Sequence, residues 1–288
     1  MRLKDKVAII TGAARGIGQA TAVKFAQEGA RVVVCDLKPE WLTESVSLCQ
    51  AAGVEAIGCA ADVRDMKSLE AMVAATLAKW GRIDCLVNNA GIVADAQMKN
   101  MTEEQFDNVI EINLKGVYNC TKAVVNTMLA QQSGVILNAS SIVGLYGNFG
   151  QTNYAASKFA VIGMMKTWAR ELGRKGIRAN AICPGFIATS ILTTIPDKVL
   201  KALEEKVPMG RLGKPEEIAE LVAYLCSDEA GFVNGQTLAV DGGWSTTKVL
   251  VQKALLAEFA REENKENQPQ AESFFAKVKE LLGGGAGH

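Results

Sequence analysis

Apolar runs and amphipathic stretches alternate along the chain from residue 3 to about residue 245. The short runs, rich in Val and Ile, predict buried β-strands, and the longer stretches between them carry the periodicity of helices. Strands that alternate with helices favour a parallel sheet. We therefore predict an α/β fold, a doubly wound sheet of seven parallel strands with helices on both faces. The predicted strands are 7–10, 31–35, 55–59, 83–87, 134–138, 177–182 and 237–240.

Helical stretches separate these strands. The first predicted helix follows strand 7–10 and ends at Glu28, where Gly29 closes it. Residues 190–212 are less regular in pattern, and we expect them to form a lid over the functional site. The other predicted helices are 40–52, 67–80, 102–130, 153–174 and 215–226.

Composition narrows the class of partner. Of the 288 residues 49% are apolar, and Lys plus Arg equal Asp plus Glu at 31 each. Zero net charge argues against a nucleic acid or a membrane surface held by electrostatics. The chain begins without a signal peptide and has no apolar run of the ~18 residues that span a bilayer, so we expect a cytoplasmic protein.

Two residue types limit the chemistry. The seven cysteines contain no Cys-x-x-Cys pair and fall mostly in apolar runs, which indicates small buried side chains in a reducing compartment. The only histidine is the last residue, His288. A Ser-His-Asp triad and a histidine metal site are therefore excluded from the core, and we expect no metal.

A tyrosine and a lysine lie four residues apart, at Tyr154 and Lys158, and Ser141 precedes the tyrosine by thirteen positions. On a helix, residues four apart project from one face. A nearby ammonium group favours the phenolate, so Lys158 is expected to lower the pKa of Tyr154 from ~10. Such a phenol can exchange a proton with an alcohol or carbonyl oxygen that the Ser141 hydroxyl holds. Taken alone, the pair also fits a buried Tyr beside a surface Lys.

A glycine-rich turn follows the first strand, at Thr11-Gly12-Ala13-Ala14-Arg15-Gly16-Ile17-Gly18. Strand, glycine turn and helix together are the context of a dinucleotide site in a Rossmann-like sheet. Glycines let the backbone approach a pyrophosphate, and the helix N-terminus meets its charge. The alternative interpretation is an ordinary tight turn.

Asp36 ends the second strand, about twenty residues past the glycines. A carboxylate at that place can accept hydrogen bonds from both ribose hydroxyls of an adenosine and would repel a 2′-phosphate, so Asp36 favours NAD(H). Arg15 in the glycine turn could pair with that phosphate, so NADP(H) is the alternative cofactor. The alternative for Asp36 is a helix cap or a turn residue.

Small and polar residues end two later strands. The fourth strand ends in Asn88-Asn89-Ala90-Gly91, and the sixth ends in Cys183-Pro184-Gly185. Small residues there let a cofactor lie across the edge of the sheet, and the nearby Thr189 could bind an amide. Asn113 lies within the predicted helix 102–130. It is either a satisfied structural amide or an interruption that holds a water beside the lysine.

Residues 3–245 resemble the short-chain dehydrogenase/reductase family of the single-domain kind. Within that family the chain is most similar to the 3-oxoacyl-(acyl-carrier-protein) reductases, through residues 141–144, 150–154 and 184–187. The family motifs match in order and spacing, and they are Thr11-Gly12-x-x-x-Gly16-Ile17-Gly18, Asn88-Asn89-Ala90-Gly91, Asn113, Ser141, Tyr154, Lys158 and Pro184-Gly185.

The resemblance implies a role for each matched residue. Tyr154 would be the general acid for carbonyl reduction or the base for alcohol oxidation, and Ser141 would hold the substrate oxygen. Lys158 would lower the pKa of the tyrosine and bind the nicotinamide ribose, and Asn113 would position a proton-relay water. The dinucleotide would contact Gly12, Arg15, Gly16, Ile17, Gly18, Asp36, Asp62, Val63, Asn89, Ala90, Gly91, Tyr154, Lys158, Pro184, Gly185, Ile187 and Thr189.

The resemblance also implies a reaction, the NAD(P)-dependent reduction of a 3-oxoacyl thioester of acyl carrier protein or CoA to the 3-hydroxyacyl product. Two departures leave the substrate open. Turn 131–134 has no basic residue to dock an acidic carrier, although Arg174 and Lys175 remain, and Asp36 favours NAD where those reductases often use NADP. The alternative is an NAD-dependent dehydrogenase of another secondary alcohol. A non-catalytic dinucleotide-binding protein is disfavoured, because it would need none of Ser141, Tyr154 and Lys158.

The resemblance ends near residue 245, so we expect a catalytic dinucleotide-binding domain at 1–247 and a helical extension at 248–288. Residues 248–261 and 271–282 are predicted helices, and the second carries one apolar stripe. The extension either packs on its own subunit, contacts another subunit or a partner, or is an engineered or assembly tail, since residues 283–288 resemble a linker.

Two of the long helices carry more apolar residues than one sheet face can cover. Apolar stripes left over after sheet packing are normally buried between subunits. The resemblance implies the same arrangement, pairs of these helices across a two-fold axis in a homotetramer. The residues that suggest it are Val117, Val124, Val125, Met128, Phe159, Ile162, Met165 and Trp168.

Overall fold

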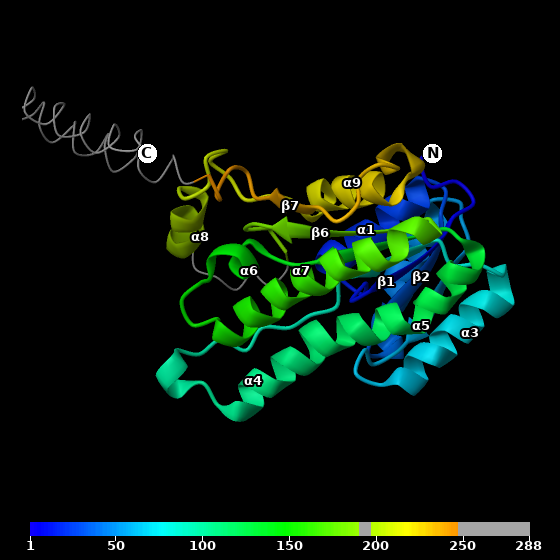
Figure 1. Ribbon diagram of the computed structural model, residues 1–288. Helices are drawn as coiled ribbons and strands as arrows, with labels where there is room; N and C mark the ends of the chain where they lie inside the picture. Colours follow the sequence, from blue (N-terminus) through cyan, green and yellow to red (C-terminus); the bar gives the residue numbers. More distant parts are fainter. Residues whose placement is uncertain (190–196, 247–288) are drawn as a thin grey trace, which may run out of the picture. The chain divides into compact units, whose positions relative to one another are not determined.

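The computed structural model describes residues 1–189 and 197–246 (Figure 1). Its centre is one sheet of seven strands in the order β3-β2-β1-β4-β5-β6-β7, and every pairing is parallel. The predicted α/β sheet is therefore confirmed. The strands are β1 (Val7–Thr11), β2 (Arg31–Asp36), β3 (Ala56–Ala60), β4 (Cys85–Asn88), β5 (Gly134–Ala139), β6 (Ile177–Pro184) and β7 (Thr237–Val240).

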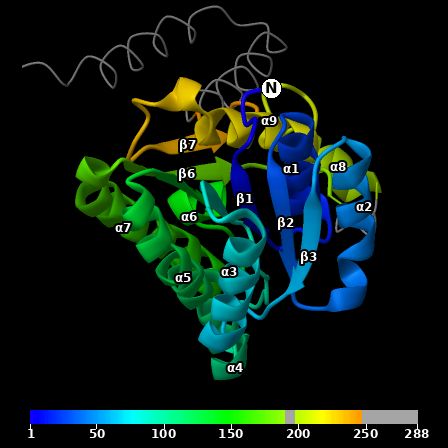
Figure 2. The same ribbon diagram turned by 90° about the vertical axis from the view of Figure 1, so that its right-hand side faces the viewer.

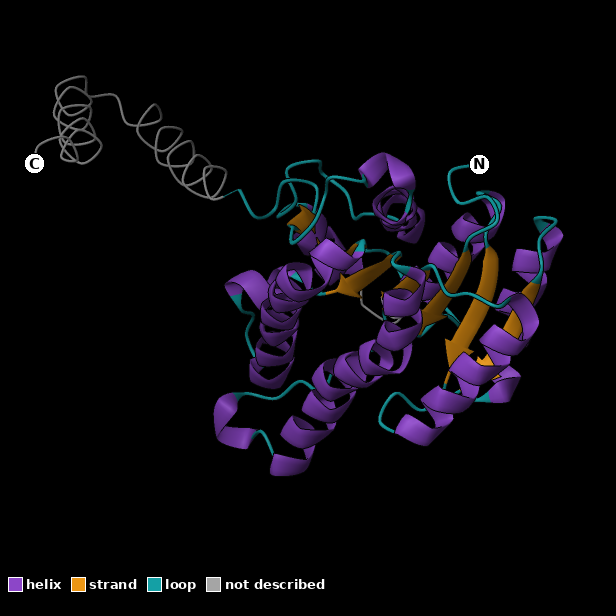
Figure 3. Cartoon of the chain, turned by 45° about the vertical axis from the view of Figure 1, so that its right-hand side comes forward, coloured by secondary structure: helices purple, strands orange, loops and turns teal. Residues whose placement is uncertain are grey.

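Helices cover both faces of the sheet, as the turned view shows (Figure 2). Figure 3 shows the same layers, with the orange strands between purple helices. One face is covered by α1 (Gly16–Gln27), α2 (Thr43–Ala51) and α9 (Pro215–Cys226). The other face is covered by α3 (Met66–Trp80), α5 (Gly116–Gln131) and α7 (Thr152–Leu172).

The first strand shows why the sequence has unbroken apolar runs. All five residues of β1 are buried, because a parallel strand between two helical layers has no face in water. Successive residues point to opposite layers, so alternate residues share one layer. Ala8 and Ile10 belong to the core that includes Phe25 of α1 and Val222 of α9. The sheet is thus held by apolar packing on both sides of each central strand.

The helix predicted at 102–130 is divided into three parts. It consists of α4 (Glu103–Ile110), a π-helical segment (Glu111–Lys115) and α5. Asn113 lies in the π-helical segment, so the regular α-helix is broken at this residue. A short helix, α6 (Ile142–Tyr146), was not predicted, because five residues are too few to show a helical period.

Parts of two predictions lie outside the described residues. Of the predicted lid, α8 (Asp197–Glu204) is described and residues 190–196 are not. The helices predicted at 248–261 and 271–282 also lie outside the described residues. The chain divides into two units, Met1–Gly243 and Trp244–His288, and the domain boundary at residue 247 stays a prediction.

The cysteines are core side chains, as expected. Six of the seven are buried and Cys59 is half-buried. Burial raises the pKa of Cys49 to about 11 and that of Cys120 to about 12. Among the described residues, no helix is long and apolar enough to cross a membrane, and no group of His, Cys, Asp and Glu could hold a metal ion.

Candidate active site

Four chain segments meet at the carboxyl edge of the sheet. In the register, Asn88 of β4 lies beside Asn138 of β5, and Ala139 lies beside Ile182 of β6. Because neighbouring strands are parallel, the segments that follow them emerge side by side. The glycine turn after β1, the segment after β4, the serines after β5 and the Pro-Gly after β6 therefore border one site.

The glycine turn is packed directly against the end of β4. A side chain at Gly12 would place its Cβ 2.8 Å from the Cα of Ala90, and the backbone φ of Gly12 is +63°. Asn89 fixes the contact, because its Nδ2 donates to the carbonyls of Thr11 and Gly12, both at 3.0 Å. The amide of Ala90 donates to the Thr11 hydroxyl at 3.1 Å. These contacts explain why only glycine fits at position 12.

The same turn leaves the start of α1 open to a ligand. Helix α1 begins at Gly16, its N-terminus has no side-chain cap, and its first turn has no acidic residue. Gly18 faces the Gly12 carbonyl so closely that a Cβ there would collide with it. Ile17 packs against the core, while Arg15 is exposed. Such a helix end attracts phosphate groups.

Segments from β2 and β6 border this turn. The Asp36 carboxylate accepts hydrogen bonds from the amides of Ala14 at 3.0 Å and Leu37 at 2.8 Å. On the other side, Thr189 approaches Gly16, whose missing Cβ would lie 3.6 Å from the Thr189 methyl group. The structure thus places Asp36 and Thr189 beside the glycine turn, as the dinucleotide interpretation requires.

Asp62 and Val63 follow β3, at a more distant part of the edge. Asp62 accepts hydrogen bonds from the Arg64 guanidinium, at 2.7 Å for the shortest, and this pairing lowers the pKa of the Asp62 carboxyl. The Val63 carbonyl accepts from Asn119 Nδ2 at 3.0 Å. Val63 also lies against Gly116, where a Cβ would come within 2.6 Å of its methyl group. Val63 is therefore tied to α5, and Asp62 is paired with Arg64.

Tyr154 and Ser141 come together from α7 and from the start of α6. Their side chains share a hydrogen bond. Ser141 also caps α6, because its hydroxyl accepts from the Val143 amide at 3.1 Å. Burial raises the pKa of the Tyr154 phenol, and the bond with Ser141 acts in the opposite direction. A hydroxyl and a neutral phenol are thus directed at one point, as the sequence predicted.

Lys158 does not act on the phenol as the sequence predicted. Its Nζ donates to the Ala139 carbonyl at 2.7 Å and lies 5.6 Å from the centroid of the Tyr154 ring. Burial disfavours the ammonium and lowers the pKa of Lys158 to about 8. The expected fall in the tyrosine pKa is therefore corrected to a rise, because loss of solvent outweighs any effect of the lysine.

Asn113 holds the segment that follows β4. Its Oδ1 accepts from the Ile92 amide at 2.8 Å, and its Nδ2 donates to the Ile92 carbonyl at 2.9 Å. Gly91 lies between this amide and the lysine, since a Cβ there would be 3.2 Å from Asn113 Oδ1 and 3.4 Å from Lys158 Nζ. The side chain is thus a satisfied structural amide, and the proton-relay water stays a prediction.

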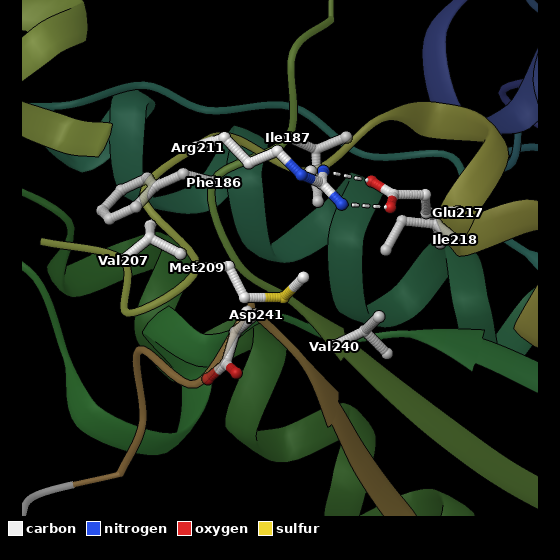
Figure 4. Close-up of a pocket in the computed structure, with 11 residues that line it drawn as sticks. Phe186, Ile187, Val207, Met209, Arg211, Glu217, Ile218, Val240 and Asp241 are labelled. Atoms are coloured by element: carbon white, nitrogen blue, oxygen red, sulfur yellow. Dashed lines mark hydrogen bonds and ion pairs between the residues drawn. The ribbon is translucent and has the colours of Figure 1, made fainter. Parts of the chain in front are cut away.

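The Pro-Gly pair at the end of β6 packs on β7. The Gly185 amide donates to the Val240 carbonyl at 3.0 Å, and a Cβ at Gly185 would lie 2.7 Å from the Cβ of Asp241. Beyond it, Ile187 lines a cavity of about 100 Å³, with the paired Arg211 and Glu217 at one wall (Figure 4).

Sequence reasoning missed two buried polar residues. Asn153 donates from Nδ2 to the carbonyls of Ala94 and Gln105, both at 3.0 Å, and accepts from the Tyr154 amide at 2.7 Å. Ser140 donates to the backbone carbonyl of Lys158 at 2.8 Å. Each directly precedes a predicted catalytic residue in the chain, and that adjacency was the available signal.

The observed geometry fits a nicotinamide dinucleotide. The turn with glycines at 12, 16 and 18 leaves a cradle that side chains would fill, and an uncapped helix end faces it. Gly12, Asp36, Asn89, Gly91, Lys158 and Thr189 are all brought to this edge of the sheet.

Comparison with known proteins supports the same conclusion. The model of the family described as Enoyl-(Acyl carrier protein) reductase matches residues 12–245. A second model, described as Chaperone protein DnaJ C-terminal region, matches residues 252–284, which lie outside the described residues.

This chain matches curated relatives over nearly their whole length. The chain is 49% identical to a 3-oxoacyl-[acyl-carrier-protein] reductase FabG of Thermotoga maritima over 243 residues, 84% of this chain and 99% of that protein. It is 42% identical to the FabG of Staphylococcus aureus over 242 residues, 83% of this chain and 97% of that protein. It is 41% identical to a (3R)-3-hydroxyacyl-CoA dehydrogenase of Homo sapiens over 251 residues, 84% of this chain and 96% of that protein. The chain belongs to the short-chain dehydrogenase/reductase family of NAD(P)(H)-dependent oxidoreductases.

Proposed function

We propose that the protein reduces a 3-oxoacyl thioester to the 3-hydroxyacyl product. The observation that carries the proposal is the hydrogen-bonded pair of Ser141 and Tyr154 beside the buried Lys158. Two hydroxyl groups directed at one point suit a single carbonyl oxygen that must be held and protonated. The names of the relatives supply the substrate class, since two act on 3-oxoacyl and one on 3-hydroxyacyl groups.

In the proposed mechanism, Ser141 donates a hydrogen bond to the C3 oxygen and orients the carbonyl. NAD(P)H, when bound, supplies the hydride that adds to C3. Tyr154 then donates its proton to the oxygen, so that the C=O group becomes CH–OH. The raised pKa of the phenol suits this direction, because the residue remains protonated at neutral pH. The reverse oxidation needs the phenolate and gains from higher pH.

Asp36 favours NAD(H) as the nucleotide in this proposal. Its carboxylate is held by two backbone amides at the end of β2. A 2′-phosphate beside it would meet a like charge, whereas two ribose hydroxyls would find an acceptor. Arg15 is exposed in the adjoining turn and has no side-chain partner among the described residues, so NADP(H) remains the weaker alternative.

The carrier of the acyl group is part of the proposal. The relatives act on groups attached to acyl carrier protein or to CoA. The turn at 131–134 offers no positive charge to an acidic carrier, which favours CoA or another small thioester. Oxidation of a different secondary alcohol by NAD is the alternative function, because the same three residues would support it. The extension at 248–288 is proposed to contact another subunit or a partner.

A homotetramer is also proposed, with a correction to the residues that build it. Five of the eight apolar residues first assigned to the outer stripes are buried in this chain, and they are Val117, Val124, Met128, Ile162 and Met165. They pack toward the sheet because helical positions three and four apart share one face. The large side chains that remain exposed on α5 and α7 are Tyr118 and Phe159, at 49% and 61%. The proposed contact is therefore centred on these two.

A substrate panel tests the function. We expect acetoacetyl thioesters to be reduced with NADH faster than with NADPH, and unactivated secondary alcohols to be oxidised slowly. Crotonyl thioesters separate this reaction from enoyl reduction, the activity named for the matching family model. They have a C=C bond to reduce and no C3 oxygen for Ser141 and Tyr154. Turnover of crotonyl but not of acetoacetyl thioesters would refute the proposal.

A further inference from the structure

The segment between β4 and α4 has a β-strand period beside the active site. Residues 91–97 contain no helix, turn or bend. Exposure alternates along them, because Gly91, Val93, Asp95 and Gln97 are exposed while Ile92, Ala94 and Ala96 are half-buried. Alternation of this kind means that successive residues face opposite sides of an extended chain.

The inward residues of this segment are tied down through their backbone. Asn113 binds both the N–H and the C=O of Ile92, and Asn153 Nδ2 donates to the Ala94 carbonyl at 3.0 Å. The Ala96 amide donates to the Gly150 carbonyl at 2.8 Å. Three consecutive inward positions are thus fixed by α7, by the turn before it and by the π-helical segment.

Two of the outward residues, Val93 and Asp95, have no such partners for their backbone groups among the residues that the structure describes. Within the described part of the chain, the backbone N–H and C=O groups of Val93 and Asp95 make no hydrogen bond. In an extended chain, successive residues point their backbone groups to opposite sides and alternate residues point theirs to the same side, so these four groups form one open edge. Open strand edges are bound by extended chains that carry amide groups.

This edge starts at the catalytic residues. Gly91 belongs to the exposed series, and a Cβ there would lie 3.4 Å from Lys158 Nζ. At the other end, Gln151, which precedes Tyr154 by three positions, donates from Nε2 to the Asp95 carboxylate at 2.9 Å. The charge of Asp95 is close enough to contribute to the raised pKa of Tyr154. When the carbonyl group of a substrate lies at Tyr154, the rest of the substrate can therefore extend along residues 91–95.

We propose that the backbone edge of Val93 and Asp95 binds the pantetheine arm of the thioester substrate. The inference rests on the proposed function and names how its carrier is recognised. Acyl carrier protein and CoA, the carriers in the names of the relatives, hold acyl groups on this same arm. The arm is an extended chain with two amide groups, which are complementary to the unpaired N–H and C=O groups of the edge.

A substrate series on the wild-type protein tests the inference first. The acetoacetyl group is presented as an S-ethyl thioester with no amide, as an N-acetylcysteamine thioester with one, and as a pantetheine thioester with two. We expect kcat/KM to rise roughly fivefold for each amide, the effect of about one net hydrogen bond. Equal kcat/KM values for the three substrates would overturn the inference.

A matched pair of variants locates the effect. Val93→Pro removes the N–H of the edge but suits an extended backbone, and it leaves the contacts of Ile92 and Ala94 in place. Val93→Ala keeps the N–H and removes only the side chain. The ratio of kcat/KM between the pantetheine and S-ethyl substrates should fall several-fold in Val93→Pro and stay unchanged in Val93→Ala. A folded Val93→Pro protein with the wild-type ratio contradicts the inference, and if that variant does not fold, the wild-type series decides.

The two natural sources of the arm are compared in the same way. The loss caused by Val93→Pro should be equal for acetoacetyl-CoA and acetoacetyl-carrier-protein, because both present the same two amides. If Val93→Pro lowers kcat/KM for neither thioester, the inference is contradicted. Absence of turnover with all three thioesters refutes the proposed function itself, whereas equal turnover of the three refutes only this inference.

Discussion

Tyr154 and Lys158 share one buried environment, and it shifts their pKa values in opposite directions. Burial disfavours a charge, so the phenol is harder to ionise and the ammonium is easier to deprotonate. The pKa of Tyr154 is raised, and that of Lys158 is lowered to about 8. The resulting neutral phenol is a proton donor, which is the role that carbonyl reduction requires.

Tyr154→Phe should remove that proton donor and little else. We expect kcat to fall at least the ~10²–10⁴-fold of a positioned general acid. The affinity for NADH should change little, because the glycine turn and Asp36 are untouched, and fluorescence titration measures it. Retention of more than a tenth of wild-type turnover would show that another group donates the proton.

The stability contribution of Lys158 should depend on pH in a defined direction. Its folded pKa of about 8 lies below the ordinary 10.5. Between these values the unfolded chain binds a proton that the folded chain does not, so stability from this residue rises with pH. The free energy of unfolding of wild type minus that of Lys158→Met should therefore increase from pH 7 to pH 9.5. A decrease in urea titrations at the two pH values would contradict the assigned shift.

Nucleotide choice should change at Asp36. Asp36→Ser removes the charge that repels a 2′-phosphate and keeps a small acceptor for the Ala14 amide. We expect the ratio of kcat/KM for NADPH over NADH to rise at least tenfold. The double variant with Arg15→Ala should lose most of that gain, because the guanidinium would be the partner of the phosphate. A wild-type protein that already prefers NADPH contradicts the assignment.

At the scale of single residues, the sequence predicted where the site residues lie better than it predicted their pKa shifts and hydrogen-bond partners. The spacing of Ser141, Tyr154 and Lys158, taken together with the motifs upstream, predicted one shared site, and the structure brings the three residues together. The pKa of Tyr154 was predicted in the wrong direction, because burial is a property of the packed fold. Asn153 was missed for a similar reason, since its partners at Ala94 and Gln105 are far from it in the chain.

At the scale of elements, the glycine turn depends on contact with β4 as much as on its own backbone. Gly12→Ala combines a left-handed φ of +63° with a Cβ 2.8 Å from Ala90. Gly53→Ala is the matched control, because its φ is +85° and nothing lies within 4 Å of its Cβ. We expect Gly53→Ala to cost about 1 kcal/mol of stability with unchanged NADH affinity. Gly12→Ala should cost more and weaken NADH binding at least tenfold, and equal effects would contradict the packing argument.

The elements themselves were predictable where a period was long enough. The seven strands and the helices α1, α3 and α9 follow from apolar runs and from glycine or proline at their ends. The only sequence signal for the π-helical segment was one polar amide, Asn113. Helix α6 has no periodic signal, and it forms because Ser141 caps it and Gly144 allows close packing, a Cβ there being 2.9 Å from the Lys158 backbone.

At the scale of the whole molecule, Phe159 leaves a large apolar surface on the helix that carries the catalytic pair. Phe159→Glu should dissociate the proposed tetramer and lower activity together, because a charge cannot be buried between apolar helices. Leu48→Glu is the control, an exposed apolar residue on α2 of the opposite face. Light scattering at assay concentration measures the mass. A fully active monomer, or equal dissociation by Leu48→Glu, would contradict the proposed contact.

The buried cysteines give this protein a surface that is easy to label. Thiol reagents react with the thiolate, and both burial and the raised pKa of Cys49 and Cys120 suppress it. A cysteine introduced at the exposed Gln97 would therefore react with a maleimide dye far faster than any native thiol. The dye would be attached at the end of segment 91–97, where its fluorescence could report substrate binding and release in real time.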